Sequence, residues 1–225
     1  MNDITIGKAR LINMDCTEFM RDIPDNYYEL AICDPPYGID AGRDIRAGIK
    51  TLKAAARRND YSKKDWDSGC PPIEYFIELM RVSKHQIIWG VNYYPYEIFA
   101  GGRIFWDKLT AENYSNSDGE IAFCSKINSV KKFKYQWHGM LQGDMKNKEF
   151  RIHPTQKPIK LYEWLLTNYA KDGDKILDTH GGSFSSAIAC NNLGFDFTGI
   201  ELDADYYNAA VKRVEAASKQ IRMFA

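Results

Sequence analysis

The sequence has few of the features that mark membrane, secreted or metal-binding proteins. No apolar stretch approaches the roughly 20 residues of a membrane span, and the first ten residues, MNDITIGKAR, lack the apolar core of a signal peptide. The five cysteines are odd in number and never form C-x-x-C, so neither a disulfide framework nor a zinc site is indicated. His138, His153 and His180 are not spaced as metal ligands. We expect a cytoplasmic protein with reduced cysteines and no metal.

The formal net charge is zero, because 30 Lys and Arg residues balance 30 Asp and Glu residues. The balance hides two basic segments. Residues 43–64 carry eight basic against two acidic side chains, and residues 126–148 carry six Lys against Asp144. Basic segments on an otherwise acidic chain suit a phosphate backbone, but a solvated surface has the same composition. Charge alone leaves both interpretations open.

Short apolar runs alternate with helical segments along the chain. β-branched or aromatic runs bounded by turn residues predict strands at 11–14, 29–33, 86–89, 103–106, 120–124, 175–177 and 195–200. Helical spacing predicts helices at 71–83, 158–170, 184–193 and 204–218. The alternation indicates an α/β fold: a doubly wound, mostly parallel sheet with helices on both faces and ligands outside the carboxyl ends of its strands. Residues 38–68 form a long polar connection, and loops of that length are usually functional or disordered.

Two strand ends carry residues suited to a nucleoside. Asp178 ends one strand and is followed by Gly181, Gly182 and a helix that opens near Ser183. A glycine turn before a helix lets the backbone approach a ligand closely. Glu201 ends the next strand about 20 residues later, from where a carboxylate can accept both hydroxyls of a ribose. The glycines alone would indicate only a tight turn, but together with Glu201 they favour a nucleoside pocket.

In combination the motifs resemble a known family. The segments DPPYG, QIIWGVNYY, FWDK, EIAFCSK, HPTQKP, ILDTHGGS and GIELDADYYNAAVKR occur in the order found in the β class of S-adenosylmethionine-dependent DNA amino-methyltransferases. Each segment alone is weak evidence for the family, but together the segments span nearly the whole chain in the family's order. The resemblance implies a single domain with a Rossmann-like methyltransferase fold in circularly permuted order: a catalytic half at 1–125, a target-recognition segment at about 126–150 and a cofactor half at 151–225. It implies S-adenosylmethionine as cofactor and double-stranded DNA as substrate, and leaves a homodimer open.

The resemblance assigns catalysis to Asp34, Pro35, Pro36 and Tyr37, and the chemistry follows from their atoms. The Asp34 carboxylate and the Pro35 carbonyl can each accept one hydrogen of an exocyclic amine, which directs the nitrogen lone pair at the sulfonium methyl. Each proline fixes φ near −65° and removes a competing backbone donor. Tyr37 offers a face on which a flipped base can stack, a contact worth about 1–3 kcal/mol. Without the cofactor motifs, the same residues would indicate only a rigid turn.

Further residues take roles by matching the family pattern. The expected cofactor-binding residues are Asp15, Thr155, Gln156, Lys157, Asp178, Gly181, Gly182, Ser183 and Glu201. Asp15 could instead cap a helix at 17–23, and Lys157 could be solvated. The basic segments suggest DNA-backbone contacts from Arg43, Arg46, Lys50, Lys53, Arg57, Arg58, Lys131, Lys132 and Lys134.

The cofactor turn departs from the family pattern. The usual D-P-F-x-G-S-G reads here as DTHGGSF, residues 178–184, so Phe184 replaces a glycine. A non-glycine residue adopts a positive φ only at a cost, and we expect weaker or altered cofactor binding. A catalytically degenerate relative that binds DNA or a partner protein therefore stays open.

The target base is a separate question. Asp34 favours adenine, since family members that modify cytosine mostly carry Ser there, and cytosine is the second alternative. Base specificity depends on unidentified groove contacts, so the target sequence cannot be read.

The basic segment after the catalytic turn gives a first prediction. We expect it to be mobile without DNA and to contact phosphates with it. Replacing Lys50, Lys53, Arg57 and Arg58 together by Ala should weaken binding to every duplex and make log affinity less steep against log salt, by about 0.9 per lost contact. Titrations at several salt concentrations measure this slope. An unchanged slope would indicate a solvated surface, and a changed sequence preference would indicate base contacts.

Overall fold

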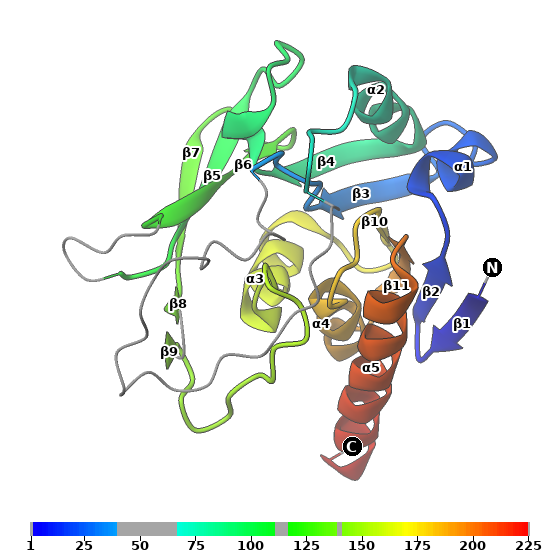
Figure 1. The fold of residues 1–225 in the computed structure, drawn as a ribbon, viewed down its shortest axis with the longest axis vertical. Coiled ribbons are helices and arrows are strands. Elements are labelled where there is room, and N and C mark those ends of the chain that lie inside the picture. Colours follow the sequence, from blue (N-terminus) through cyan, green and yellow to red (C-terminus); the bar gives the residue numbers. More distant parts are fainter. Residues whose placement is uncertain (1, 40–66, 111–116, 139–140, 225) are drawn as a thin grey trace.

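A computed structural model describes residues 2–39, 67–110, 117–138 and 141–224, with the backbone alone over 220–224. Its centre is a nine-stranded sheet in the order β1-β2-β11-β10-β3-β4-β6-β5-β7, shown in Figure 1. Its strands are β1 (Asn2–Ile6), β2 (Ala9–Asn13), β3 (Tyr28–Cys33), β4 (Ser83–Trp89), β5 (Gly102–Asp107), β6 (Gly119–Cys124), β7 (Val130–Lys134), β10 (Lys175–Asp178) and β11 (Asp196–Glu201). A separate pair joins β8 (Trp137–His138) to β9 (Leu141–Gln142).

The strands from the end of the chain lie in the middle of the sheet. β2, β11, β10, β3 and β4 run parallel, with β10 and β11 inserted between β2 and β3. β6 runs antiparallel to both β4 and β5. The carboxyl ends of β3 and β10 are therefore neighbours, and ligands bind outside such ends in α/β sheets. The predicted α/β fold is confirmed.

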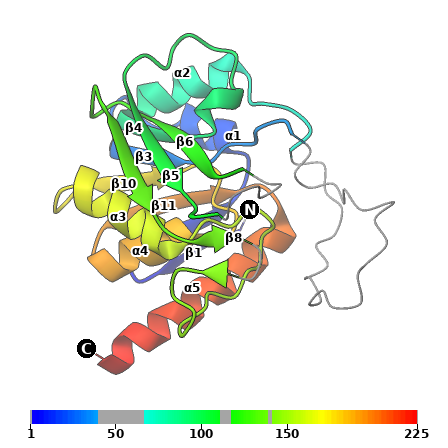
Figure 2. The same cartoon turned by 90° about the vertical axis from the view of Figure 1, so that its left-hand side faces the viewer.

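Helices cover both faces of the sheet. Figures 1 and 2 show α1 (Cys16–Arg21) and α2 (Ile73–Val82) on one face, and α3 (Ile159–Tyr169), α4 (Ser185–Leu193) and α5 (Ala204–Phe224) on the other. A short 3₁₀ helix, η1, spans Val91–Tyr93. Successive strand residues point to opposite faces, so Leu30 and Ile32 pack in the α3–α5 layer while Ala31 and Cys33 pack in the α1–α2 layer. Because both faces are buried, the central strands are continuously apolar.

The predicted strands and helices are present with small shifts at their ends. The sequence did not indicate β1, β7, β8 or β9. β7 reads VKKFK and lies at the sheet edge, where Val130 and its three lysines are exposed. An exposed edge strand needs no apolar pattern, and its charges discourage pairing with another sheet. Among the described residues, no helix is long and apolar enough to cross a membrane.

Candidate active site

Two cavities meet at the carboxyl ends of the central strands. The larger, about 630 Å³, is lined by the Asp-Pro-Pro-Tyr turn, by residues of β5 and β6, and by residues 154–157. The smaller, about 320 Å³, is lined by Asp15, the glycine turn at 181–183, Glu201 and residues 155–157. Their common wall consists of Asp34, Pro36, Thr155, Gln156 and Lys157. Molecules bound in the two cavities would face each other across Asp34.

The turn that carries Asp34 is held by Asp67, which also lines the larger cavity. This carboxylate is 1% exposed, and its Oδ1 accepts hydrogen bonds from the backbone N–H groups of Tyr37 at 2.7 Å and Gly38 at 2.8 Å. The Pro35 carbonyl accepts a hydrogen bond from the Tyr94 hydroxyl at 3.0 Å. A carbonyl oxygen has two lone pairs, so Pro35 can accept a second donor. The turn therefore presents two fixed acceptors to the cavities.

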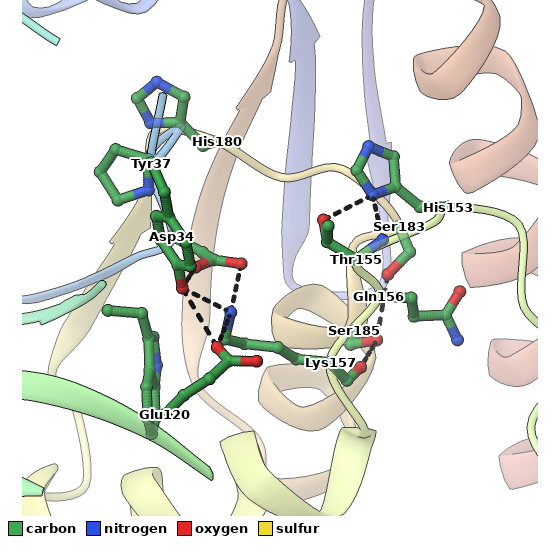
Figure 3. A network of polar contacts seen from close by, with 12 residues as sticks. Asp34, Tyr37, Glu120, His153, Thr155, Gln156, Lys157, His180, Ser183 and Ser185 are labelled. Carbon is green, nitrogen blue, oxygen red and sulfur yellow. Dashed lines mark hydrogen bonds and ion pairs between the residues drawn. The ribbon is translucent and has the colours of Figure 1, made fainter. Parts of the chain in front are cut away.

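A buried ammonium group lies against the Asp34 carboxylate. The Lys157 side chain is 3% exposed, and its Nζ lies 2.5 Å from Asp34 Oδ2 and 2.8 Å from Glu120 Oε2. The Tyr37 hydroxyl donates to Asp34 Oδ1 at 2.6 Å and lies 3.1 Å from Glu120 Oε2. Lys108 Nζ contacts the other Glu120 oxygen at 2.6 Å. Figure 3 shows Lys157 reaching from its loop towards both acids. The sequence suggested for Lys157 either the cofactor-pocket wall or solvent, and the solvated alternative is wrong.

The two acids of this cluster titrate differently. Burial raises the pKa of Asp34, and the charge of Lys157 opposes this rise without cancelling it. Burial acts the same way on Glu120, but Lys157 and Lys108 outweigh it and lower the pKa of Glu120 to about 2. Burial lowers the pKa of Lys157, whereas Asp34 and Glu120 raise it above the usual value. On acidification, Asp34 is therefore protonated before Glu120.

The smaller cavity is bounded by two carboxylates that also hold backbone. Glu201 accepts hydrogen bonds from the N–H of Gly182 at 2.7 Å and of Asp203 at 2.8 Å. Asp15 caps α1 by accepting from the N–H groups of Thr17 and Glu18, so the helix-cap interpretation of Asp15 is confirmed. Asp15 and Glu201 both line the cavity, and capping does not prevent a carboxylate from accepting further donors.

The other expected cofactor residues divide into lining and supporting groups. Thr155, Gly181, Gly182 and Ser183 line the smaller cavity. Asp178 is 1% exposed and lies behind the turn, outside the described lining. It accepts from the Ser186 hydroxyl at 2.6 Å and the His180 N–H at 3.1 Å, and burial raises its pKa to about 7. Asp178 therefore supports the turn from inside.

Gln156 has a mixed position. It lines both cavities, yet its side-chain oxygen accepts the Ile152 N–H at 3.0 Å and its carbonyl accepts from the Trp137 indole at 2.7 Å. These contacts fix the loop that carries Lys157.

Arg213 links this loop to the glycine turn. Its guanidinium donates to the Ser183 carbonyl at 2.8 Å and to Glu149 at 2.7 Å, and Glu149 also accepts the N–H of Ile159 at the start of α3. Ser185 donates to the Lys157 carbonyl at 2.7 Å. Sequence reasoning did not find Arg213, because nothing in the amphipathic pattern of α5 marks one basic residue as buried.

Phe184 adopts a left-handed backbone conformation, which favours glycine. Its φ is 51° and its ψ is 38°, and its ring is fully buried in the core beside Tyr207. A Cβ built on Gly181 would lie 1.9 Å from the Phe184 ring, and one on Gly199 would lie 2.6 Å from it. These two glycines make room for the ring, which is outside the described cavity lining. The ring points into the core, and the weaker or altered cofactor binding expected from the sequence stays a prediction.

The expected DNA contacts are only partly described. Lys131, Lys132 and Lys134 are exposed along β7, and Lys132 Nζ lies 3.9 Å from Asp107. Arg43, Arg46, Lys50, Lys53, Arg57 and Arg58 lie outside the described residues.

Comparisons with known proteins agree with this geometry. A model of the N6/N4 methyltransferase family, described as DNA methylase, matches residues 103–212. The type II methyltransferase M2.DpnII of Streptococcus pneumoniae is 24% identical, with 95% of this chain and 92% of the relative covered. The type II methyltransferase M2.LlaDCHI of Lactococcus lactis subsp. cremoris is also 24% identical, with 92% and 89% covered.

Solved structures share the fold. The crystal structure of an M1.HpyAVI–SAM complex has a TM-score of 0.55 at 19% identity, covering 91% of this chain and 99% of that one. The cytosine-N4-specific PvuII DNA methyltransferase has a TM-score of 0.57 at 12% identity, covering 95% and 92%.

Fold and site together define a methyltransferase with a Rossmann-like sheet, in which a nucleoside-sized cavity adjoins a fork of hydrogen-bond acceptors. The comparisons identify a DNA methyltransferase that is similar to the N6/N4 DNA methylases and to two type II methyltransferases.

The Phe184 turn gives a stability prediction. Phe184→Ala should destabilise the fold by about 3–5 kcal/mol because it empties part of the core. Phe184→Gly should be less destabilised than Phe184→Ala by about 1 kcal/mol, since glycine adopts a positive φ without strain. Urea unfolding measures both. The Kd for S-adenosylmethionine of folded variants should stay within about threefold of wild type. Equal stabilities of the two variants would contradict the strained conformation.

Proposed function

We propose that the chain transfers a methyl group from S-adenosylmethionine to the exocyclic amino group of adenine in duplex DNA, with the target base flipped out of the helix. The observation that carries this proposal is the position of Asp34, which lines both cavities, next to Pro35, which lines the larger one. The smaller cavity takes the cofactor and the larger one takes the base.

The smaller cavity fits a cationic nucleoside. Asp15, Asp34, Glu201 and Asp203 line it, against one ammonium from Lys157. His180 also lines it, and burial lowers the pKa of His180 to about 4, so this ring adds no positive charge at neutral pH. Glu201 is placed to accept ribose hydroxyls, and the backbone at 181–183 lies against the ligand. When bound, S-adenosylmethionine supplies an electrophilic methyl group on a positively charged sulfur.

The protein's own contribution is to hold the amino group. Asp34 and the Pro35 carbonyl each accept one of its hydrogens, so the nitrogen lone pair is directed across the common wall towards the smaller cavity. The acceptors are fixed before the base arrives, because Asp67 holds the turn and the prolines restrict it. Fixed acceptors need no reorganisation during the reaction.

The larger cavity fits a flipped base. The Tyr37 and Tyr93 rings stack with centroids 5.0 Å apart and planes 13° apart, and both line the cavity. A base that stacks on this aromatic wall recovers part of the few kcal/mol spent on leaving the duplex. The choice of adenine rests on Asp34 as first residue of the motif. The shared fold of a cytosine-N4-specific enzyme does not favour either base.

The exposed face of β7 supports a DNA contact. Lys131, Lys132 and Lys134 are presented to solvent by a strand next to β5, and β5 residues line the base cavity. These lysines would neutralise phosphates on either side of the flipped nucleotide. A homodimer stays a prediction, and sedimentation of the free protein tests it.

Methylation of mixed-sequence duplex DNA with labelled S-adenosylmethionine, followed by nucleoside analysis, tests the proposal. We expect N6-methyladenine from the wild type. Asp34→Ala should lower kcat by at least about 10²-fold, as for a lost transition-state contact. Its fold should survive because Lys157 keeps Glu120 as a partner. N4-methylcytosine as product would correct the target base, and cofactor and DNA binding without any product would favour the degenerate relative.

Glu201 gives a separate prediction about the cofactor. Glu201→Ala should weaken S-adenosylmethionine binding by about 10-fold to 100-fold, because it removes hydrogen bonds to a charged acceptor and releases the Gly182 N–H. DNA affinity without cofactor should not change. Calorimetry measures cofactor affinity and fluorescence anisotropy measures DNA affinity. The matched control is Glu163→Gln in α3, a half-buried acid outside the described lining of both cavities. Equal cofactor affinity in mutant and wild type would mean that Glu201 only shapes the turn.

A further inference from the structure

Both oxygens of the catalytic carboxylate already accept hydrogen bonds from the protein itself. The Tyr37 hydroxyl occupies Asp34 Oδ1 at 2.6 Å, and the Lys157 ammonium occupies Oδ2 at 2.5 Å. An incoming amino group needs the lone pairs that face the cavity. Each carboxylate oxygen can accept two donors, but Tyr37 and Lys157 line the same cavity as Asp34, so these two donors compete with the amino group for Asp34.

Glu120 offers a second acceptor to the same two donors. Its Oε2 lies 2.8 Å from Lys157 Nζ and 3.1 Å from the Tyr37 hydroxyl, so either donor can transfer to it by a small side-chain movement. Its other oxygen is held by Lys108 at 2.6 Å, which fixes the carboxylate in place. Glu120 belongs to β6 and lines the base cavity but not the described part of the cofactor cavity.

We propose that Glu120 is a positioning residue that takes over the Tyr37 hydroxyl and the Lys157 ammonium as the target amino group engages Asp34. This inference rests on the proposed function. Glu120 does not touch the reacting atoms. It prevents the two displaced donors from being buried without an acceptor, a state that is costly in a low-dielectric site.

The charges around Asp34 give this role a signature in the pH profile. Asp34 faces Lys157 from the loop before α3, Glu120 from β6, Tyr37 from its own turn, Tyr94 after η1, Tyr162 from α3 and Asp178 from β10. Glu120 raises the pKa of Asp34 and Lys157 lowers it. The reaction needs ionised Asp34, so activity falls as pH drops through the pKa of this carboxyl.

Removing the charge of Glu120 and removing that of Lys157 should shift the acidic limb of the pH–rate profile in opposite directions. In Glu120→Gln the pKa of Asp34 falls and the limb moves to lower pH. In Lys157→Met the pKa of Asp34 rises and the limb moves to higher pH. A purely structural role for Glu120 would lower the amount of folded enzyme without moving the limb.

The experiment measures single-turnover methylation of duplex DNA by the full chain between about pH 5 and 9, at saturating cofactor. For Glu120→Gln we expect a plateau rate at least about 10-fold lower, unchanged cofactor Kd and an acidic limb at lower pH. In the double variant Glu120→Gln/Lys157→Met, the fold-reduction of the plateau rate should be smaller than the product of the two single reductions. The reason is that this variant has no Lys157 ammonium for Glu120 to accept. Glu163→Gln should match wild type.

Glu120→Asp keeps the charge but shortens the reach, and provides the test if Glu120→Gln does not fold. Its plateau rate should fall while the acidic limb moves less than in Glu120→Gln. A wild-type plateau in a folded Glu120 variant, or an unmoved limb in Glu120→Gln, would overturn the inference. These outcomes differ from failure of the proposed function, in which the wild type itself would methylate no DNA.

Discussion

The ion pair between the buried Lys157 ammonium and Asp34 is the interaction on which the site depends. A lysine that is 3% exposed needs compensating charge, and here it is supplied by two acids from different parts of the sheet. Asp34 follows β3, Glu120 lies in β6, and Lys157 itself precedes α3. The ion pairs thus join the Asp-Pro-Pro-Tyr turn, the antiparallel side of the sheet and the loop before α3. Removing one partner of such a buried pair typically costs about 3–5 kcal/mol, because it leaves an uncompensated charge.

The permuted strand order explains why one loop serves both cavities. β10 and β11 come last in the chain yet pair between β2 and β3, so the chain must return from the edge strands across the carboxyl ends of the sheet. Residues 153–158 belong to this return, and they form part of the wall between the cavities. Arg213 and Ser185 anchor this path to the glycine turn. A substitution in this loop should therefore affect base and cofactor together.

The sequence predicted those parts of the site that follow strands. Asp34, Asp178 and Glu201 could be placed because apolar runs end in turn residues and parallel strands share an edge. Glu120 and Asp67 could not, since their roles arise from contacts with Tyr37, which lies 30 positions from Asp67 and 83 positions from Glu120 in the chain. Burial of Lys157 was equally hidden, because a lysine before a helix is usually solvated.

Phe184 departs from the motif, but its side chain lies in the core and outside the described cavity lining. The αL conformation costs a non-glycine residue about 1–2 kcal/mol, and burying a phenylalanine side chain contributes about 1.5–3 kcal/mol, so the ring can offset the strain of its own backbone. This requires space below the turn, which Gly181 and Gly199 provide. The backbone and small side chains of 181–183 line the smaller cavity, whereas the Phe184 ring is buried in the core. The lining of the smaller cavity is therefore formed without the Phe184 side chain, although the sequence of the turn has changed.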